Sequence, residues 1–321
     1  MLRFLAMCLT GMAGLIGMAP VHADDYPARP IRVVLPFPAS SGLDNAARML
    51  MQKVGEAQGW KFVIENKPGA NGFIAAQEAR QAAPDGYTLF FTGNTTHGAN
   101  SALFKTLPYD PIGDFEPITR VGVFPLVLMA KPQLGVESVA ALTELARRRP
   151  GELTFAAGSA GPRVAAENYR HAASVDARYI PYKSSPQALT DLIGGHVDFM
   201  FLDTVASIPM IQAGRIKGLA VTSLRRLDSL PGVPTMAESG FPGFEQLNWA
   251  GVFAPRGVPQ PVVDTLYRAI SRYVASDEWK QYVARLGGYA DVLTPAQTAA
   301  WVEREVRGYR ETLKRAGVEP E

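Results

Sequence analysis

The sequence predicts an α/β protein with two lobes, each built on an open β-sheet. Three observations predict this class. The chain has 321 residues, about two average domains in length. Its hydrophobic content of 47% and its mean hydropathy near zero exclude a disordered or fibrous chain. Short β-branched runs alternate with amphipathic segments in both halves, which is typical of sheets covered by helices.

The first half contains a repeated strand–helix pattern. A β-branched strand at 31–35 precedes a helix that opens at Asp44, and a strand at 62–64 precedes a helix at 75–81. A third strand follows at 87–91. This spacing predicts parallel β-α-β units with both faces of the sheet covered.

The second half repeats the pattern. Strands are expected at 126–129, 153–157, 179–182, 197–201 and 218–222. Helices are expected at 136–149, from Pro162 through Tyr169, and at 261–276, 278–286 and 295–316. Pro162 suits the first position of its helix and Gly161 the cap before it.

Residues 1–23 have the pattern of a secretory signal peptide. Arg3 is the only charge before Asp24, residues 4–19 are almost all apolar, and Val21-His22-Ala23 fits a cleavage site. The apolar run is shorter than the roughly 18 to 20 residues that a membrane anchor needs. We therefore expect cleavage after Ala23 and a periplasmic protein. Because Cys8 is the only cysteine, the mature chain would have no disulfide and no thiolate site.

Charge and motifs exclude several function classes. The net charge of +2 is spread without a basic block, so we expect no nucleic-acid partner. No Walker, Rossmann or Gly-x-Ser-x-Gly motif occurs at the required position. His97, His171 and His196 are far apart and lack helical partners for metal binding. His97 is expected to support a loop, and the other two to be exposed near helix ends. We expect no catalytic residue, metal or cofactor.

Two strand-to-helix loops are candidates for ligand binding, because ligands of open parallel sheets lie beyond the carboxyl ends of strands. Small residues allow close backbone approach, and a helix start offers free N–H groups to an anion. The alternative is that both loops are only tight turns that cap helices. The candidate residues of the first loop are Phe37, Pro38, Ala39, Ser40, Ser41, Gly42 and Asp44, and those of the second are Ser159, Ala160 and Gly161.

Four further residues are candidates. Asn94 and Thr95 follow a strand end, and Asp203 follows the strand at 197–201, where it would orient water or a ligand hydroxyl. The alternative is that Asn94 and Asp203, like Ser40 and Ser159, are local turn or cap residues. Arg163 lies in the first turn of a helix, where a cation opposes the helix dipole. It would grip a ligand carboxylate or close over it. Alternatively, it points to solvent or pairs with Glu167.

Several motifs resemble one known family over nearly the whole mature chain. They include the segment from Tyr26 to Arg32, Pro36-Phe37-Pro38-Ala39, 65–72, 84–89, 107–111, 181–183, 191–195, 220–223, 230–235, 240–244 and 249–251. In this order they resemble the Bug-type receptors, which are periplasmic substrate-binding proteins of the tripartite tricarboxylate transporter family.

The resemblance implies a type II periplasmic-binding-protein fold of the Venus-flytrap kind, with the ligand between two lobes. Residues 24–124 plus 245–321 would form lobe 1 and residues 125–244 lobe 2, with crossings near 121–126 and 241–249. It also implies a small carboxylate ligand held mainly by backbone N–H groups of the two candidate loops, and membrane permease subunits as partners. We expect a monomer. A sensory subunit and an α/β enzyme are the alternative functions.

Two departures from the family pattern affect the ligand. The family usually has a glycine pair where this chain has Ser40-Ser41, and its second loop is commonly longer, with a histidine near the position of Arg163. The identity of the ligand therefore does not transfer from any relative.

Overall fold

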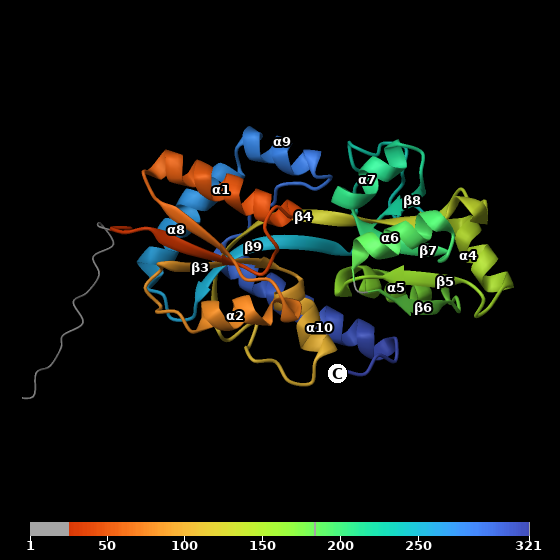
Figure 1. Ribbon diagram of the computed structural model, residues 1–321, viewed down its shortest axis with the longest axis horizontal. Helices are drawn as coiled ribbons and strands as arrows, with labels where there is room; N and C mark the ends of the chain where they lie inside the picture. The colour runs from red at the N-terminus through yellow and green to blue at the C-terminus, as the bar shows by residue number, and fades with distance from the viewer. Residues whose placement is uncertain (1–25, 183, 321) are drawn as a thin grey trace, which may run out of the picture.

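The computed structural model describes residues 26–182 and 184–320, and these form an elongated molecule with two halves side by side (Figure 1). One nine-stranded sheet runs through both halves in the order β2-β1-β3-β9-β4-β7-β5-β6, with β8 paired to β4. The strands are β1 (Ile31–Leu35), β2 (Phe62–Asn66), β3 (Thr88–Gly93), β4 (Phe115–Ala130), β5 (Thr154–Ala157), β6 (Arg178–Pro181), β7 (Phe199–Asp203), β8 (Lys217–Val221) and β9 (Leu247–Pro255).

Helices cover the sheet in both halves (Figure 1). The helices are α1 (Gly42–Gln58), α2 (Phe73–Arg80), α3 (Asn100–Leu103), α4 (Val139–Arg148), α5 (Ala160–Ala173), α6 (Ser185–Gly194), α7 (Thr204–Gln212), α8 (Gln260–Val274), α9 (Asp277–Arg285) and α10 (Pro295–Arg315). Short turns η2 (Ala70–Gly72), η3 (Thr95–Ala99) and η4 (Pro132–Leu134) complete the order. In the described part of the chain, none of these helices is long and apolar enough to cross a membrane.

The prediction of parallel β-α-β units is confirmed at the two ends of the sheet. Strand β1 pairs in parallel with β2 and β3, and β5 pairs in parallel with β6 and β7. The middle differs, because β9 is antiparallel to β3 and β4, and β4 is antiparallel to β7 and β8. The fold is therefore α/β with a mixed sheet at its centre.

Strand β4 connects the halves. From Phe115 to Pro125, β4 pairs with β9, and from Leu126 to Ala130 it pairs with β7 and β8. The sequence pattern predicted only 126–129 of β4 and missed β9. Almost every residue of β4 is buried, so no alternation marks the strand. Pro117 resembles a strand breaker, but a register shift between Pro117 and Thr119 accommodates it.

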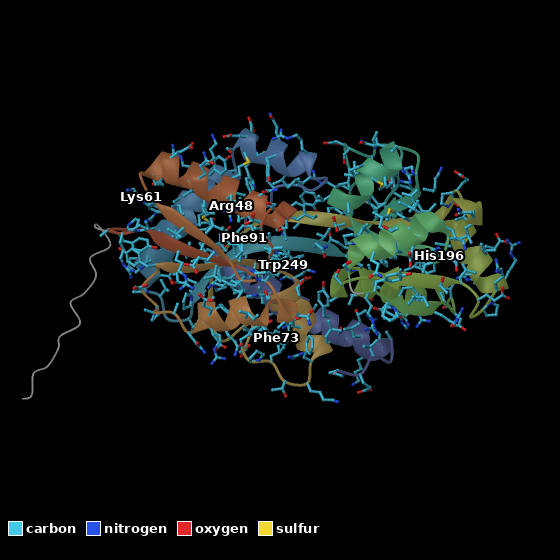
Figure 2. The ribbon with its side chains drawn as sticks, viewed as in Figure 1. Arg48, Lys61, Phe73, Phe91, His196 and Trp249 are labelled. Carbon is cyan, nitrogen blue, oxygen red and sulfur yellow. The ribbon has the colours of Figure 1, made fainter. Side chains whose placement is uncertain are left out.

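Separate hydrophobic cores support the two halves. The clusters around β1, β3 and β9 draw on residues 26–124 and 247–306, and those around β5, β7 and β8 on residues 126–244. A fifth cluster joins the halves, since Val164 of α5 packs with Tyr309 and Leu313 of α10. Figure 2 shows Phe91 and Trp249 in the half that holds α1, and His196 at the other end.

Candidate functional site

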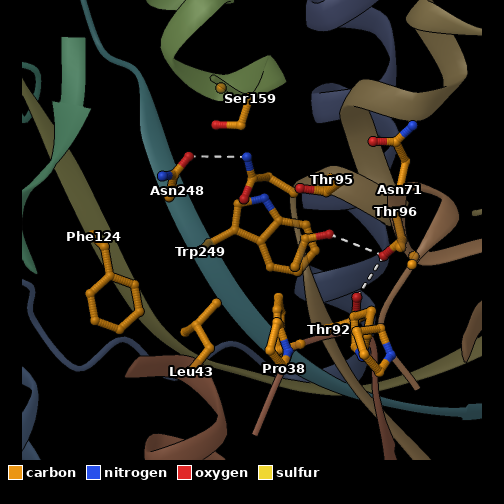
Figure 3. Close-up of a pocket in the computed structure, with 18 residues that line it drawn as sticks. Pro38, Leu43, Asn71, Thr92, Thr95, Thr96, Phe124, Ser159, Asn248 and Trp249 are labelled. Atoms are coloured by element: carbon orange, nitrogen blue, oxygen red, sulfur yellow. Dashed lines mark hydrogen bonds between the residues drawn. The ribbon is translucent and has the colours of Figure 1, made fainter. Parts of the chain in front are cut away.

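A cavity of about 330 Å³ lies where the β1–α1 loop, the end of β3, strand β9 and the start of α5 meet (Figure 3). We call it the first chamber. It is lined by Pro36, Phe37, Pro38, Leu43, Pro68, Gly69, Asn71, Gly72, Thr92, Gly93, Asn94, Thr95, Thr96, Phe124, Ser159, Gly161, Asn248 and Trp249.

A second chamber of about 250 Å³ adjoins the first. It lies between the N-termini of α1 and α7, and Phe37, Pro38, Leu43, Phe124 and Asn248 line both chambers. Its other lining residues are Ser41, Gly42, Asp203, Val205 and Leu286. Together the chambers form one cleft bounded by elements of both halves.

Nine of the predicted site residues line this cleft. Phe37, Pro38, Asn94, Thr95, Ser159 and Gly161 line the first chamber, and Phe37 and Pro38 are shared with the second, which adds Ser41, Gly42 and Asp203. Ala39, Ser40, Asp44, Ala160 and Arg163 are outside the lining of both chambers. The two loops chosen from the sequence thus meet at one cleft, and ligand contact by their individual residues stays a prediction.

The start of α1 is held by a hydrogen-bonded carboxylate. Asp44 is buried and accepts hydrogen bonds from the Ser40 amide at 2.8 Å, from Arg48 Nε at 3.0 Å and from Asn66 Nδ2 at 2.8 Å. Burial alone would raise the pKa of Asp44, but these hydrogen bonds outweigh it and leave the pKa below its usual value. Ser41 caps the helix by accepting the Asp44 amide at 3.2 Å. Asp44 therefore stabilises the β1–α1 loop without lining the cleft itself.

The start of α5 lacks such a cap. Its N-cap residue is Ser159, and the serine side chain makes no capping hydrogen bond. The prediction that Gly161 caps the helix is wrong, because α5 begins two residues earlier than expected, at Ala160. The first N–H groups of a helix have no intrahelical acceptor. Because Ser159 and Gly161 line the first chamber, these donors and the positive end of the helix dipole favour an anion there.

Gly161 leaves room for a polar pair. A Cβ atom at this position would lie 2.6 Å from Asn248 Oδ1 and 3.2 Å from Asn94 Nδ2. Asn94 Nδ2 donates to Asn248 Oδ1 at 3.0 Å, a bond drawn as a dashed line from Asn248 in Figure 3. Asn94 Nδ2 also donates to Tyr309 Oη at 3.0 Å. Burial raises the pKa of Tyr309 above its usual value, so its hydroxyl is neutral at physiological pH. The pair links β3, β9 and α10 beside α5.

Trp249 lines the first chamber and is held in place by a hydrogen bond. Its indole Nε1 donates to Glu305 of α10 at 2.9 Å. Burial raises the pKa of the Glu305 carboxyl to about 7, although this hydrogen bond and the nearby Arg120 and Arg304 act in the opposite direction.

The lining is nearly without charge. Of the residues that the structure describes around the two chambers, Asp203 is the only one with a charged side chain. An anion in the first chamber would therefore be held by backbone N–H groups, hydroxyls and amides. Nor do the described residues include a group of three or more His, Cys, Asp or Glu side chains that would hold a metal ion.

His97 and Arg163 contact aromatic rings. His97 is fully buried, stacks on Phe253 with ring centroids 4.2 Å apart, and has its pKa lowered to about 3 by burial. The structure confirms it as a supporting residue, and His171 and His196 as exposed. The Arg163 guanidinium lies 4.4 Å from the centre of the Tyr179 ring. The alternative in which Arg163 pairs with Glu167 is not found, because Glu167 pairs with Arg170 at 2.9 Å. Contact between Arg163 and a ligand carboxylate stays a prediction.

Sequence reasoning missed 14 of the 23 residues that line the two chambers. Phe124, Asn248 and Trp249 lie on β4 and β9, in stretches that were not predicted as strands. Asn71 lies in η2, which the sequence showed only as a turn. Its positive φ of 51° belongs to the left-handed region, which Asn tolerates better than most residues. The Pro-Gly-Ala-Asn-Gly run, which is typical of a tight turn, is therefore the sequence feature that could have identified Asn71 as a lining residue.

Comparison with known proteins agrees with this geometry. The family model described as "Tripartite tricarboxylate transporter family receptor" matches residues 46–317. Protein BugT of Bordetella pertussis is 33% identical over 302 residues, which cover 93% of each chain. The solved structure of R. palustris Rpa4515 with adipate has a TM-score of 0.82 at 33% identity and covers 92% of this chain and all of its own.

A second solved relative also has a bound carboxylate. MatC from Rhodopseudomonas palustris, with bound malate, has a TM-score of 0.76 at 30% identity and covers 90% of this chain and all of its own. The two-lobed periplasmic-binding-protein fold is therefore shown, and so is the family, which is one of solute receptors and not of enzymes. The chain belongs to the tripartite tricarboxylate transporter family receptors.

Proposed function

We propose that the protein is an extracytoplasmic receptor that captures a small carboxylate-bearing molecule between its lobes and delivers it to a membrane permease. The observation that carries the proposal is the uncapped start of α5, which opens with Ser159 into a cavity free of cationic side chains among the residues described. Desolvated N–H and hydroxyl donors bind a carboxylate through charge-assisted hydrogen bonds, each contributing roughly 1.5–3 kcal/mol.

The comparisons support the ligand class and the partner. Rpa4515 was solved with adipate and MatC with malate, and both are carboxylates. The family description names a transporter, so a permease is the expected recipient. We extend both properties to this chain as part of the proposal.

Thermal-shift and calorimetric titration against mono-, di- and tricarboxylates tests the proposal. A ligand at 100 times its dissociation constant stabilises the folded state by about 2.7 kcal/mol. Ser159→Ala should reduce affinity about tenfold and barely change the melting temperature, because the serine makes no capping bond. The matched control is Ser138→Ala at the start of α4, where the serine accepts the Ala141 amide at 3.1 Å. This variant should lose stability but not affinity. Absence of binding by every carboxylate would contradict the proposal.

A sensory subunit and an enzyme are the alternatives. A sensor would bind the same ligand and pass the signal to a different partner, so pull-down with the permease subunits in the presence and absence of ligand separates the two. An enzyme would convert its ligand, so recovery of the bound carboxylate unchanged after incubation supports a receptor. We propose that the chain has no catalytic activity.

The proposed location, cleavage site and assembly follow the sequence. The residues of the predicted signal peptide lie outside the described part of the chain. We propose export to the periplasm, cleavage after Ala23, lobes formed by residues 24–124 plus 245–321 and by 125–244, and a monomeric state. Mass spectrometry of periplasmic protein should find Asp24 at the N-terminus, and intact Met1 would contradict export. Light scattering tests the monomer.

A further inference from the structure

Asp203 is the one charged side chain that lines the cleft in the described part of the chain. It ends β7 and caps α7, where its Oδ1 atom accepts the Ala206 amide at 3.0 Å. Neighbouring backbone amides of the same turn add only weaker interactions, and among the described residues no other side chain donates to this carboxylate or forms an ion pair with it. The carboxylate therefore has acceptor capacity left over.

The surroundings of Asp203 increase the effect of its charge. Leu43, Phe124, Val205 and Leu286 form apolar walls of the second chamber. Burial raises the pKa of Asp203, and the backbone hydrogen bonds at the start of α7 only partly oppose it. A carboxylate in such a place is stabilised most by a donor or cation that comes with the ligand.

The two chambers thus have opposite polarity. The first offers neutral donors at the start of α5, and the second offers an acceptor at the start of α7, with apolar side chains shared between them. We propose that Asp203 determines specificity by accepting a hydrogen bond from the far end of the ligand. The ligand is then a carboxylate with an apolar middle and an ammonium or hydroxyl group at its other end. This inference rests on the proposed function.

A dicarboxylate fits this arrangement poorly. A second carboxylate in the second chamber would lie near Asp203, and like charges at short range in apolar surroundings repel strongly. Adipate, the molecule solved with Rpa4515, has carboxylates at both ends. This chain should therefore bind adipate more weakly than an acid of similar length with an amino or hydroxyl group at its other end.

Matched ligands test the inference. Straight-chain acids of four to eight carbons are titrated as ω-amino, ω-hydroxy, ω-carboxy and unsubstituted forms. For the length that binds tightest, the amino or hydroxy form should bind at least tenfold more tightly than the dicarboxylate. Asp203→Asn keeps a good helix cap and removes the charge. This variant should lose the preference by about tenfold, at an unchanged melting temperature. The control Asp277→Asn, at an exposed position of α9, should keep the preference.

The outcomes separate this inference from the proposed function. If the dicarboxylate binds as tightly as the amino and hydroxy forms, or if Asp203→Asn leaves the order of affinities unchanged, the inference is overturned and the receptor function stands. If no carboxylate binds at all, both are overturned.

Discussion

At Gly161 the site depends on the absence of a side chain. A Cβ atom there would press on the Asn94–Asn248 pair, whose flexible ends line the first chamber. Gly161→Val should therefore reduce carboxylate affinity at least tenfold while the protein still folds, as measured by calorimetry and circular dichroism. Gly158→Ala is the control, because a Cβ atom at that glycine would meet the backbone of Ser184 and Ser185. The Gly158→Ala variant should therefore have a lower melting temperature. If Gly161→Val leaves the affinity unchanged, the start of α5 does not contact the ligand.

Glu305 makes stability depend on pH. Its pKa is about 7 in the folded protein and near 4.5 in an unfolded chain, so the folded state holds the proton more tightly. Its contribution to the free energy of unfolding is full below pH 4.5 and is lost as the pH rises to 7. Glu305→Gln cannot ionise and can still accept the Trp249 hydrogen bond. At pH 8 this variant should be more stable than the wild type by roughly 1–2 kcal/mol. The difference is smaller than the full pKa shift implies, because solvent screens the partly exposed Glu305 carboxylate.

Denaturant titrations of both proteins at pH 4.5 and pH 8 measure this difference. The variant and the wild type should agree closely at the lower pH. An equal gap at both pH values would show that the carboxyl does not titrate in this range.

Helices α1 and α9 have the same kind of serine cap, so comparing them distinguishes an effect on stability from an effect on ligand binding. Ser41 caps α1 and Ser276 caps α9, and each accepts the amide of the residue three positions on at 3.2 Å. Each Ser→Ala change should cost about 1 kcal/mol of stability. Only Ser41 lines the cleft, so only Ser41→Ala should also weaken carboxylate binding several-fold in calorimetry. Equal binding by both variants would place the ligand away from α1.

The elements that sequence predicts well are those with a clear period and clear ends. Most outer strands and the amphipathic helices follow the expected pattern, and the Ser-Ser-Gly run before Asp44 marks the start of α1 closely. The central strands fail for a physical reason. Strand β4 is buried along nearly its whole length and contains Pro117, Gly122 and Pro125, so neither alternation nor composition identifies it. Its pairing with β9 joins residues more than 120 positions apart, which no local pattern encodes.

The same reason explains the candidate site. Helix starts can be predicted from local Ser, Gly and Asp residues, and both candidate loops were identified from such residues. Asn248 and Trp249 reach the first chamber only because β9 lies between β3 and β4. From its place in the sequence, Arg163 was expected to be available for binding a ligand carboxylate. In the structure, Tyr179 of the neighbouring strand lies against its guanidinium. A partner from another strand is visible only once the sheet is assembled.

At the scale of the molecule, the halves contact each other across the cleft. Thr204 of α7 donates to the Leu286 carbonyl at 3.1 Å, and a Cβ atom on Gly42 of α1 would lie 3.8 Å from Val205 Cγ1. Strand β4 continues from one half into the other, and the chain returns to the first half just before β9, so we expect the hinge of a rigid-body movement at these two places. A receptor that works by closure should populate this arrangement more when its ligand is bound.

A cysteine pair tests that closure directly, because the sequence contains only Cys8, which lies within the predicted signal peptide. In the mature protein, Gly42→Cys with Val205→Cys would place two thiols on facing walls of the cleft, because a Cβ atom on Gly42 would lie 3.8 Å from Val205 Cγ1, an atom that a cysteine sulfur could replace. Under mild oxidation the bond should form several-fold faster with a saturating carboxylate than without one, as followed by non-reducing electrophoresis. Once formed, it should slow ligand release, and reduction should restore the original rate. Each single cysteine variant controls for crosslinking between molecules. Equal rates of bond formation with and without ligand would mean that binding does not draw the two halves together.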